Sequence, residues 1–201
     1  MTGIAQIMPC RLFVLSCCFL CLTRPVLPAE QSATFEVRPE TTFQSMVGFG
    51  LVGAHACAWT YCFAIFTAQF QGSMGILAPA DGEGPRQGEL VVPKRFWALA
   101  NYSRFARPGW KLMQIAGAGF ANTGFVSPDG TRFAIVALNP SAQPQPTTYD
   151  FGNWTISAGE AFATSDTLNL ARVPAPVTQL HRLTATLAPM SVTTFVGKLS
   201  R

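Results

Sequence analysis

The chain has few charged residues, and those that it has are dispersed. Only 12% of its 201 residues are Asp, Glu, Lys or Arg, and the formal net charge is +4. No run of Lys and Arg is present that could follow a phosphate backbone, which argues against nucleic acid as a partner. Apolar residues make up 49% of the chain, enough to bury a core, and this excludes an intrinsically disordered protein.

Residues that bind metals and cofactors are also scarce. The two histidines, His55 and His181, are far apart, and no Cys-x-x-Cys pair occurs. The segment Val47-Gly48-Phe49-Gly50 has no third glycine and no acidic residue at the distance that a dinucleotide-binding loop requires. We therefore expect no metal site and no cofactor.

Residues 1–29 have the pattern of a secretory signal peptide. Arg11 precedes the apolar run Leu12–Leu22, and a small residue, Ala29, follows Pro28 at the expected cleavage region. The run is shorter than the about 20 residues that cross a bilayer, although a membrane anchor remains the alternative. Cleavage removes Arg11 and Arg24 and lowers the charge from +4 to +2. We expect a secreted, extracellular protein without membrane contact after cleavage.

Cysteines and glycosylation triplets fit the same compartment. Four of the six cysteines lie in the signal segment, which leaves Cys57 and Cys62. Their odd spacing places them on opposite faces of a strand, so we favour two buried thiols over a disulfide, which stays open. Asn101-Tyr102-Ser103 and Asn153-Trp154-Thr155 match the N-glycosylation pattern. We expect a glycoprotein modified at Asn101 and Asn153.

The N-terminal part, residues 30–92, predicts few regular elements. Thr34–Val37 alternates between polar and apolar residues, which is typical of a half-buried strand that ends at Arg38-Pro39. Ala56–Phe66 is almost wholly apolar, which favours a strand buried on both faces, with a buried helical segment as the alternative. A loop rich in Gly and Pro follows at residues 78–88.

An amphipathic helix is predicted next, with Pro93 at its first position. Its apolar face has helical spacing and ends before Pro108-Gly109. The residues of this face are Phe96, Leu99, Ala100 and Ser103.

The remaining sequence predicts an antiparallel β-sandwich. The turn Ser127-Pro128-Asp129-Gly130 separates two of the strands, and Pro140–Pro146 is expected to be a loop. The expected strands are Trp110–Ile115, Phe125–Val126, Phe133–Leu138, Thr147–Phe151, Glu160–Thr164, Leu183–Leu187 and Ser191–Val196.

Several of these segments resemble glycoside hydrolase family 30, especially its fungal endo-β-1,6-galactanase-like group. The resemblance lies in Phe96–Gly109, in Ser127–Gly130 with Ile135–Asn139, in Thr164–Asp166 with Asn169–Ala171, and in Leu187–Phe195. It implies a mainly β fold, in which a C-terminal antiparallel β-sandwich is joined through one helix to a remnant of a (β/α)₈ barrel. The domains would be a signal peptide (1–29), a barrel remnant with an N-terminal strand (30–92), and the junction helix with the sandwich (93–201).

The resemblance also reveals a deficit. Thr34–Gly50 is similar to the family's opening, where the first strand joins the sandwich and the next one starts the barrel, and Ala58–Phe66 is similar to the eighth barrel strand. Only five residues separate Gly50 from Ala56, where six barrel strands would stand, and a complete barrel needs at least about 200 residues. The family's two catalytic glutamates belong to the missing strands, so we assign no catalytic residue.

Other carboxylates do not replace that pair convincingly. Retaining glycosidases need two carboxyl groups about 5 to 5.5 Å apart. Glu83 and Glu89 are a conceivable pair, but they flank a Gly-rich loop, and loops seldom hold such a pair without support.

We therefore expect a secreted protein related to enzymes that cleave β-linked galactan or a similar cell-wall polysaccharide. Its enzymatic status is uncertain and inactivity is favoured, because the catalytic barrel is largely missing. The alternative is a non-catalytic carbohydrate-binding sandwich. Phe49 and Trp59 correspond to positions at the mouth of the family's barrel and are the candidate contacts for a polysaccharide partner; packing in a core is their alternative role.

Overall fold

The computed structural model describes residues 32–45, 65–67, 75–77, 90–117 and 121–201. The larger of its two sheets contains β1 (Ala33–Ser45), β5 (Lys111–Ala116), β6 (Asn122–Val126), β7 (Arg132–Asn139), β8 (Gln145–Asp150), β9 (Thr155–Thr164), β10 (Ala171–Val173), β11 (Val177–Gln179), β12 (Arg182–Leu187) and β13 (Ser191–Ser200). The smaller contains β2 (Ile65–Thr67), β3 (Gly75–Leu77) and β4 (Leu90–Val91), and one helix is described, α1 (Lys94–Ser103).

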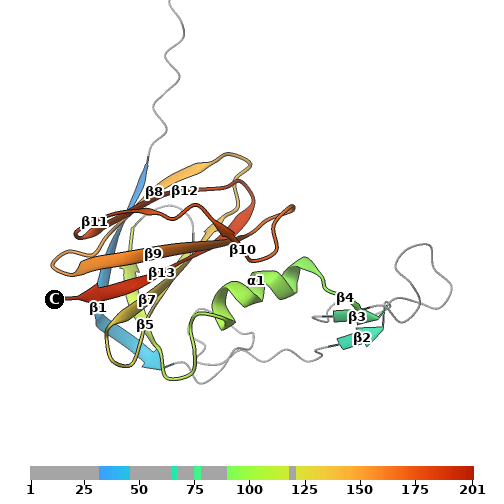
Figure 1. Cartoon of the computed structure of the whole chain (residues 1–201), viewed down its shortest axis with the longest axis horizontal. Helices are drawn as coiled ribbons and strands as arrows, with labels where there is room; N and C mark the ends of the chain where they lie inside the picture. Colours follow the sequence, from blue (N-terminus) through green and yellow to red (C-terminus); the bar gives the residue numbers. More distant parts are fainter. Residues whose placement is uncertain (1–31, 46–64, 68–74, 78–89, 118–120) are drawn as a thin grey trace, which may run out of the picture.

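The ten strands of the large sheet form one continuous, curled layer rather than two separate ones. Their order is β10-β9-β13-β7-β6-β5-β1-β8-β12-β11, and the curl brings the β9–β10 end toward the β11–β12 end (Figure 1). The small sheet has the order β2-β3-β4, with β2 parallel to β3. The mainly β fold with one junction helix is therefore confirmed for the described residues.

All seven strands expected in the C-terminal part are present, with shifted ends. β9 and β13 run several residues further than expected, and β8 begins at Gln145, inside the expected loop. β10 and β11 were not predicted from the sequence. Each has only three residues, too few to show a period of two.

β1 joins the sandwich, as the family resemblance implied, by pairing with β5 on one side and β8 on the other. The prediction that it ends at Arg38-Pro39 is wrong. The strand continues to Ser45 because Pro39, which has no N–H to donate, lies where the β1–β5 register shifts, between Arg38 and Thr42. The strands after the helix pair with one another in antiparallel fashion, as expected, and the added strand β1 is parallel to β8.

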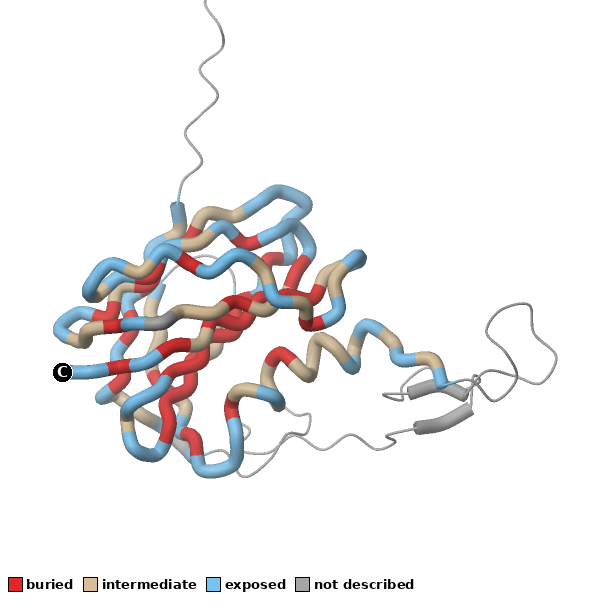
Figure 2. The backbone as a smooth tube through the Cα atoms, viewed as in Figure 1, coloured by how far each residue is buried: buried red, intermediate tan, exposed pale blue. Residues whose placement is uncertain are grey.

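The core fills the inside of the curl. β7 is buried on both faces: Phe133, Ile135 and Ala137 belong to the inner cluster, and Ala134 and Val136 to a second cluster on the outer face. Figure 2 shows this band of buried backbone through the middle of the sheet. The prediction of a buried strand at this position is confirmed.

The turn between β6 and β7 has the expected geometry. Gly130 has φ +71°, and its N–H donates to the carbonyl of Ser127 at 2.9 Å. Asp129 Oδ1 accepts hydrogen bonds from Ser127 Oγ at 2.5 Å and from the Thr131 N–H at 3.1 Å. The Ser127 hydroxyl, followed by the Thr131 amide, lowers the pKa of Asp129 to about 2.

α1 packs on the outer face of the sheet through a different side than predicted. Phe96, which the helical spacing placed on the buried face, is 39% exposed, whereas Asn101 is 0% exposed. The helix also starts one residue later than predicted, because Pro93 is its N-cap and Lys94 its first residue.

The amide of Asn101 joins the helix to the sheet. Its Nδ2 donates to Trp97 O at 2.9 Å and to Thr164 Oγ1 at 2.8 Å, and its Oδ1 accepts from Thr194 Oγ1 at 3.0 Å. Thr164 Oγ1 also accepts from the Leu170 N–H at 3.0 Å. A polar side chain is stable in this buried position because each of its donors and its acceptor is used.

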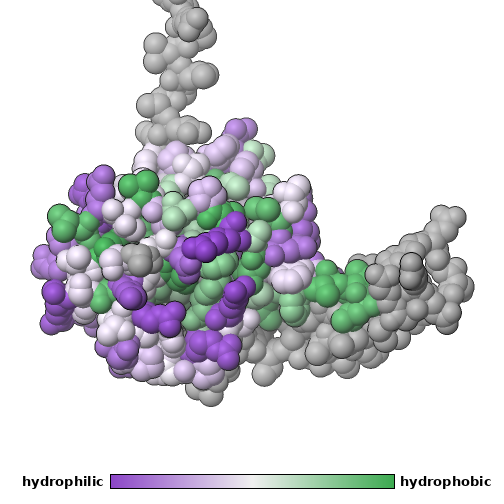
Figure 3. All heavy atoms as spheres, in the orientation of Figure 1, coloured by the Kyte–Doolittle hydropathy of each residue, from purple (hydrophilic) through white to green (hydrophobic). Residues whose placement is uncertain are grey.

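Apolar side chains gather beside the N-terminal end of α1. Leu90, Val92 and Phe96 are exposed there, and Figure 3 shows the corresponding hydrophobic surface next to the helix. Among the described residues, no helix has the length and apolar character needed to span a membrane.

Several predictions concern parts of the chain that lie outside the described residues. These parts are the signal segment 1–29, Phe49, Trp59, Cys57, Cys62 and the Glu83–Glu89 pair. Of the predicted strand Ala56–Phe66, the described portion is Ile65 and Phe66, in β2.

Replacing Asn101 by Ala should lower the free energy of unfolding by about 3 kcal/mol, because the substitution removes the three side-chain hydrogen bonds of a fully buried amide and leaves a cavity in its place. Urea titration measures the change. Asn169→Ala is the matched control: Asn169 is exposed and contacts Lys94 at the surface, so its loss should cost less than about 0.5 kcal/mol. Equal effects of the two substitutions would contradict the role of Asn101.

Stability should depend on pH through Asp129. Its folded pKa of about 2 is below the ordinary 3.8, so the turn contributes stability above pH 4, and this contribution disappears as the pH falls through 2. The difference in unfolding free energy between the wild type and Asp129→Ala, measured by urea titration from pH 5 to pH 2, should shrink along this range. A difference that stays constant with pH would show that the carboxylate does not stabilise the turn.

Candidate functional site

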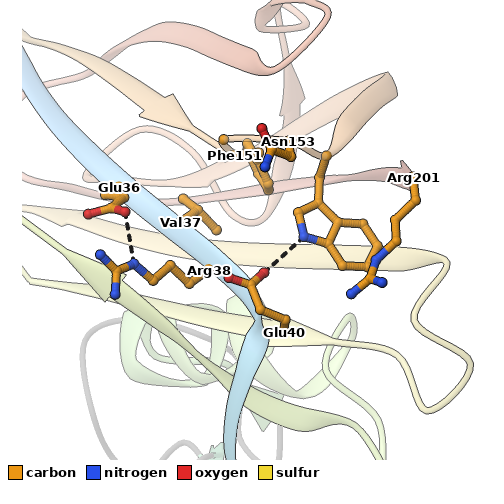
Figure 4. A pocket seen from close by; sticks show the side chains of 9 residues that line it. Glu36, Val37, Arg38, Glu40, Phe151, Asn153 and Arg201 are labelled. Atoms are coloured by element: carbon orange, nitrogen blue, oxygen red, sulfur yellow. Dashed lines mark hydrogen bonds and ion pairs between the residues drawn. The ribbon is translucent and has the colours of Figure 1, made fainter.

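A cleft of about 500 Å³ lies where the first half of β1 meets the β8–β9 turn and the end of the chain. Figure 4 shows its lining side chains. They are Glu36, Val37, Arg38, Glu40, Phe151, Gly152, Asn153, Trp154 and Arg201.

β1 supplies one polar wall of this cleft. Successive side chains of a strand point to opposite faces, so Glu36, Arg38 and Glu40 are exposed while Phe35 and Val37 enter the core. Arg38 Nε donates to Glu36 Oε1 at 2.8 Å, and this hydrogen bond raises the pKa of the Arg38 guanidinium. The two side chains lie side by side along the strand (Figure 4).

Trp154 forms the opposite wall and is held at several points. Its indole Nε1 donates to Glu40 Oε2 at 2.9 Å, and its ring packs against the inner core cluster. The guanidinium of Arg201 lies over the ring, 4.8 Å from its centroid. The carbonyl of Trp154 is within 2.9 Å of His181 Nδ1, which anchors the backbone of the turn.

The charges of the cleft are balanced. Two carboxylates face two guanidinium groups, and an aromatic ring and the Asn153 amide complete the lining. Such a surface has many donors and acceptors at fixed positions but no excess charge, which suits a neutral ligand rich in hydroxyl groups.

The two carboxylates of the cleft do not form a glycosidase pair. Glu36 and Glu40 are four residues apart on an extended strand, which separates their Cα atoms by about 13 Å, and retaining enzymes bring two carboxyl groups to about 5 to 5.5 Å. Each is also engaged, Glu36 by Arg38 and Glu40 by Trp154. Glu36 and Glu40 therefore do not match the geometry of the carboxyl pair of a retaining glycosidase.

The sequence-predicted residues have different positions. Phe49 and Trp59 lie outside the described residues, so their role in substrate binding stays a prediction. Asn153 is exposed at the rim of the cleft, whereas Asn101 is buried with its Nδ2 fully used. The folded structure has no room for a glycan on Asn101.

Sequence reasoning missed the cleft itself. No sequence pattern gave a role to Trp154 or Glu40. Their contact joins residues 114 positions apart, and no local sequence pattern indicates it. In the part of the chain that the structure describes, no group of three His, Cys, Asp or Glu side chains could hold a metal ion.

Neither a family model nor a curated protein matches this sequence. Solved structures that are similar include a conserved exported protein from Bacteroides fragilis, at 25% identity and TM-score 0.56, over 71% of this chain and 30% of that one. The catalytic domain of GH30 xylanase C from Talaromyces cellulolyticus is similar at 19% identity and TM-score 0.52, over 63% of this chain and 27% of that one. A GH30 endoxylanase from Clostridium papyrosolvens C71 is similar at 24% identity and TM-score 0.50, over 53% and 28%.

These similarities concern the fold. The chain spans less than a third of the length of each of these structures. Over the matched part, its fold resembles that of GH30 xylanases, which agrees with the family named from the sequence but does not extend to the galactanase-like group. The chain therefore has a family 30-like fold. Most of the length of those proteins has no counterpart in it.

Proposed function

We propose that this chain is a glycoside hydrolase-related protein that binds a neutral cell-wall polysaccharide and does not cleave it. The Trp154 cleft is the observation that carries the proposal, because it combines an anchored aromatic ring with charge-balanced polar walls. The family 30-like fold supports the relation to glycoside hydrolases, since two of the similar structures are xylanases by name.

We further propose that the preferred polysaccharide is a β-linked galactan. The support is the sequence resemblance of Phe96–Gly109 and the later segments to the endo-β-1,6-galactanase-like group. Xylan is the competing ligand, because two of the similar structures are named as xylanases. A direct comparison of the two polysaccharides separates these possibilities.

The proposed lack of hydrolysis rests on an internal stretch of the sequence. Five residues stand between Gly50 and Ala56, so the strands that carry the catalytic glutamates of the resembling family have no counterpart. Among the described residues, the carboxylates of the cleft are too far apart along β1 and are already paired.

Binding should depend on the two sides of the cleft. Trp154→Ala and Glu40→Ala should each raise the dissociation constant for a β-1,6-galactan oligosaccharide by about tenfold, because each removes one member of the pair that shapes the binding surface. Calorimetric titration of the unglycosylated chain measures the constants. Asp166→Ala is the matched control, since Asp166 is exposed and does not line the cleft, and it should leave neutral-glycan affinity unchanged.

The same preparations test the absence of turnover. Incubation with β-1,6-galactan and with xylan should release no reducing sugar above the blank. Release that depends on a carboxylate of this chain would contradict the proposal. If all variants bind the oligosaccharide equally well, the cleft is not the binding site.

Secretion is also part of the proposal, and it predicts where a glycan is attached. Expressed in a glycosylating host, the secreted chain should carry a glycan at Asn153 and none at Asn101, because Asn153 is exposed and Asn101 Nδ2 is buried and bonded. Peptide mapping by mass spectrometry after deglycosylation distinguishes the sites. A folded chain with a glycan on Asn101 would contradict the buried position of this residue.

A further inference from the structure

A second depression, of about 580 Å³, lies on the outer face of the sheet, away from the inner core. Arg132 on β7 precedes Ala134 by two residues, and Lys198 on β13 follows Val196 by two, so both basic side chains point to the same outer side as the second cluster. The depression is lined by Arg132, Gly159, Glu160, Arg172, Val196, Gly197 and Lys198. Figure 3 shows strongly hydrophilic side chains gathered over β9, β10 and β13.

The charges of this depression are not balanced, in contrast to the Trp154 cleft. Three cations line it together with one carboxylate. That carboxylate is already engaged, because Arg172 Nη2 donates to Glu160 Oε1 at 2.6 Å. The ion pair holds the Arg172 guanidinium in place and leaves the charges of Arg132 and Lys198 without an anionic partner among the described residues.

Arg132 and Lys198 are also direct neighbours. They are register partners across the antiparallel β7–β13 pair, and like charges at such positions repel each other. The Trp110 ring lies 5.8 Å from the Arg132 guanidinium and favours that cation, but it does not neutralise it. A bound anion would offset this repulsion.

The backbone near the site is irregular as well. The β9–β13 register shifts between Val196 and Lys198, so that Glu160 pairs with Val196 while Ser157 pairs with Lys198. This β-bulge increases the local twist of β9 and sets the direction of Glu160, and with it that of Arg172. Bulges are frequent next to binding sites for this reason.

We propose that this depression binds the carboxylate groups of an acidic polysaccharide, one that contains uronic acid residues. The assignment to a glycan rests on the proposed function, and the assignment to an acidic one rests on the excess of cations. Arg132, Lys198 and the oriented Arg172 supply charge-assisted hydrogen bonds to carboxylates. A nucleic acid is disfavoured because three cations do not follow a phosphate backbone and Glu160 repels it.

With this second site, the chain has two separate glycan sites. The Trp154 cleft at the end of the sandwich accepts a neutral segment, and the outer depression accepts an acidic one. No residue lines both. The two sites can therefore be tested independently of each other.

Titration of the full chain with oligogalacturonate at low ionic strength tests the inference. The double variant Arg132→Gln, Lys198→Gln should raise its dissociation constant at least tenfold, and wild-type affinity should fall as salt is added. Lys111→Gln, which removes one charge from an exposed position on β5, should change the constant less than twofold. Because the substitutions relieve a like-charge contact, the thermal midpoint of the double variant should not fall, which separates loss of binding from loss of fold.

Three results would overturn the inference. One is unchanged oligogalacturonate affinity in the double variant. Another is that the wild type binds an uncharged galactan oligosaccharide as tightly as oligogalacturonate, and that the same two substitutions weaken this binding. The third is binding of inorganic phosphate as tight as that of the oligosaccharide, which would identify a general anion site. If the chain does not bind the neutral glycan but still binds oligogalacturonate, only the proposed function of the Trp154 cleft is contradicted. The inference about the outer depression is then unaffected.

Discussion

The buried amide of Asn101 is the interaction on which the arrangement of helix and sandwich depends. It connects α1 to the end of β9 through Thr164 and to the middle of β13 through Thr194, so one side chain fixes the helix on two adjacent strands. An apolar residue of similar size would pack there, but it would leave the Thr164 and Thr194 hydroxyls with fewer partners. The network therefore specifies one position of the helix. With the helix in place, Trp110 and Phe125 are covered on the outer face, and Arg132 is left at the edge of this covered area.

Much of the sandwich could be predicted from the sequence, because its strands are bounded by clear turn residues. Ser127–Gly130 is such a turn, and β7 is apolar on both faces since both faces are buried. Three features could not be predicted. Pro39 signals the end of a strand, but the register shift in β1 accommodates it. Asn101 matches a glycosylation pattern, which contains no information on burial. Trp154 meets Glu40 across 114 positions, a contact that only the curled sheet creates.

The two surface hollows differ in charge, and this difference follows from strand geometry. On β1, alternation puts two glutamates and one arginine on the same side, and Arg201 completes a balanced set. On β7, β9, β10 and β13, the outward positions hold three cations and a glutamate that is already paired. A chain with a family 30-like fold, without the barrel strands of the resembling enzymes, thus keeps surfaces suited to recognising a polysaccharide. The proposed recognition of a polysaccharide without cleavage accounts for both hollows.

The most direct test uses the indole N–H signals of the four tryptophans, observed by heteronuclear NMR on the full chain. Trp154 lies in the neutral cleft, and Trp110 lies under Arg132 at the edge of the cationic depression. A neutral galactan oligosaccharide should shift the Trp154 signal and leave that of Trp110 in place, oligogalacturonate should do the reverse, and neither ligand should be degraded during the experiment. If both ligands shift the same signal, or shift neither of the two, the account of two glycan-binding surfaces on a non-hydrolytic sandwich is contradicted.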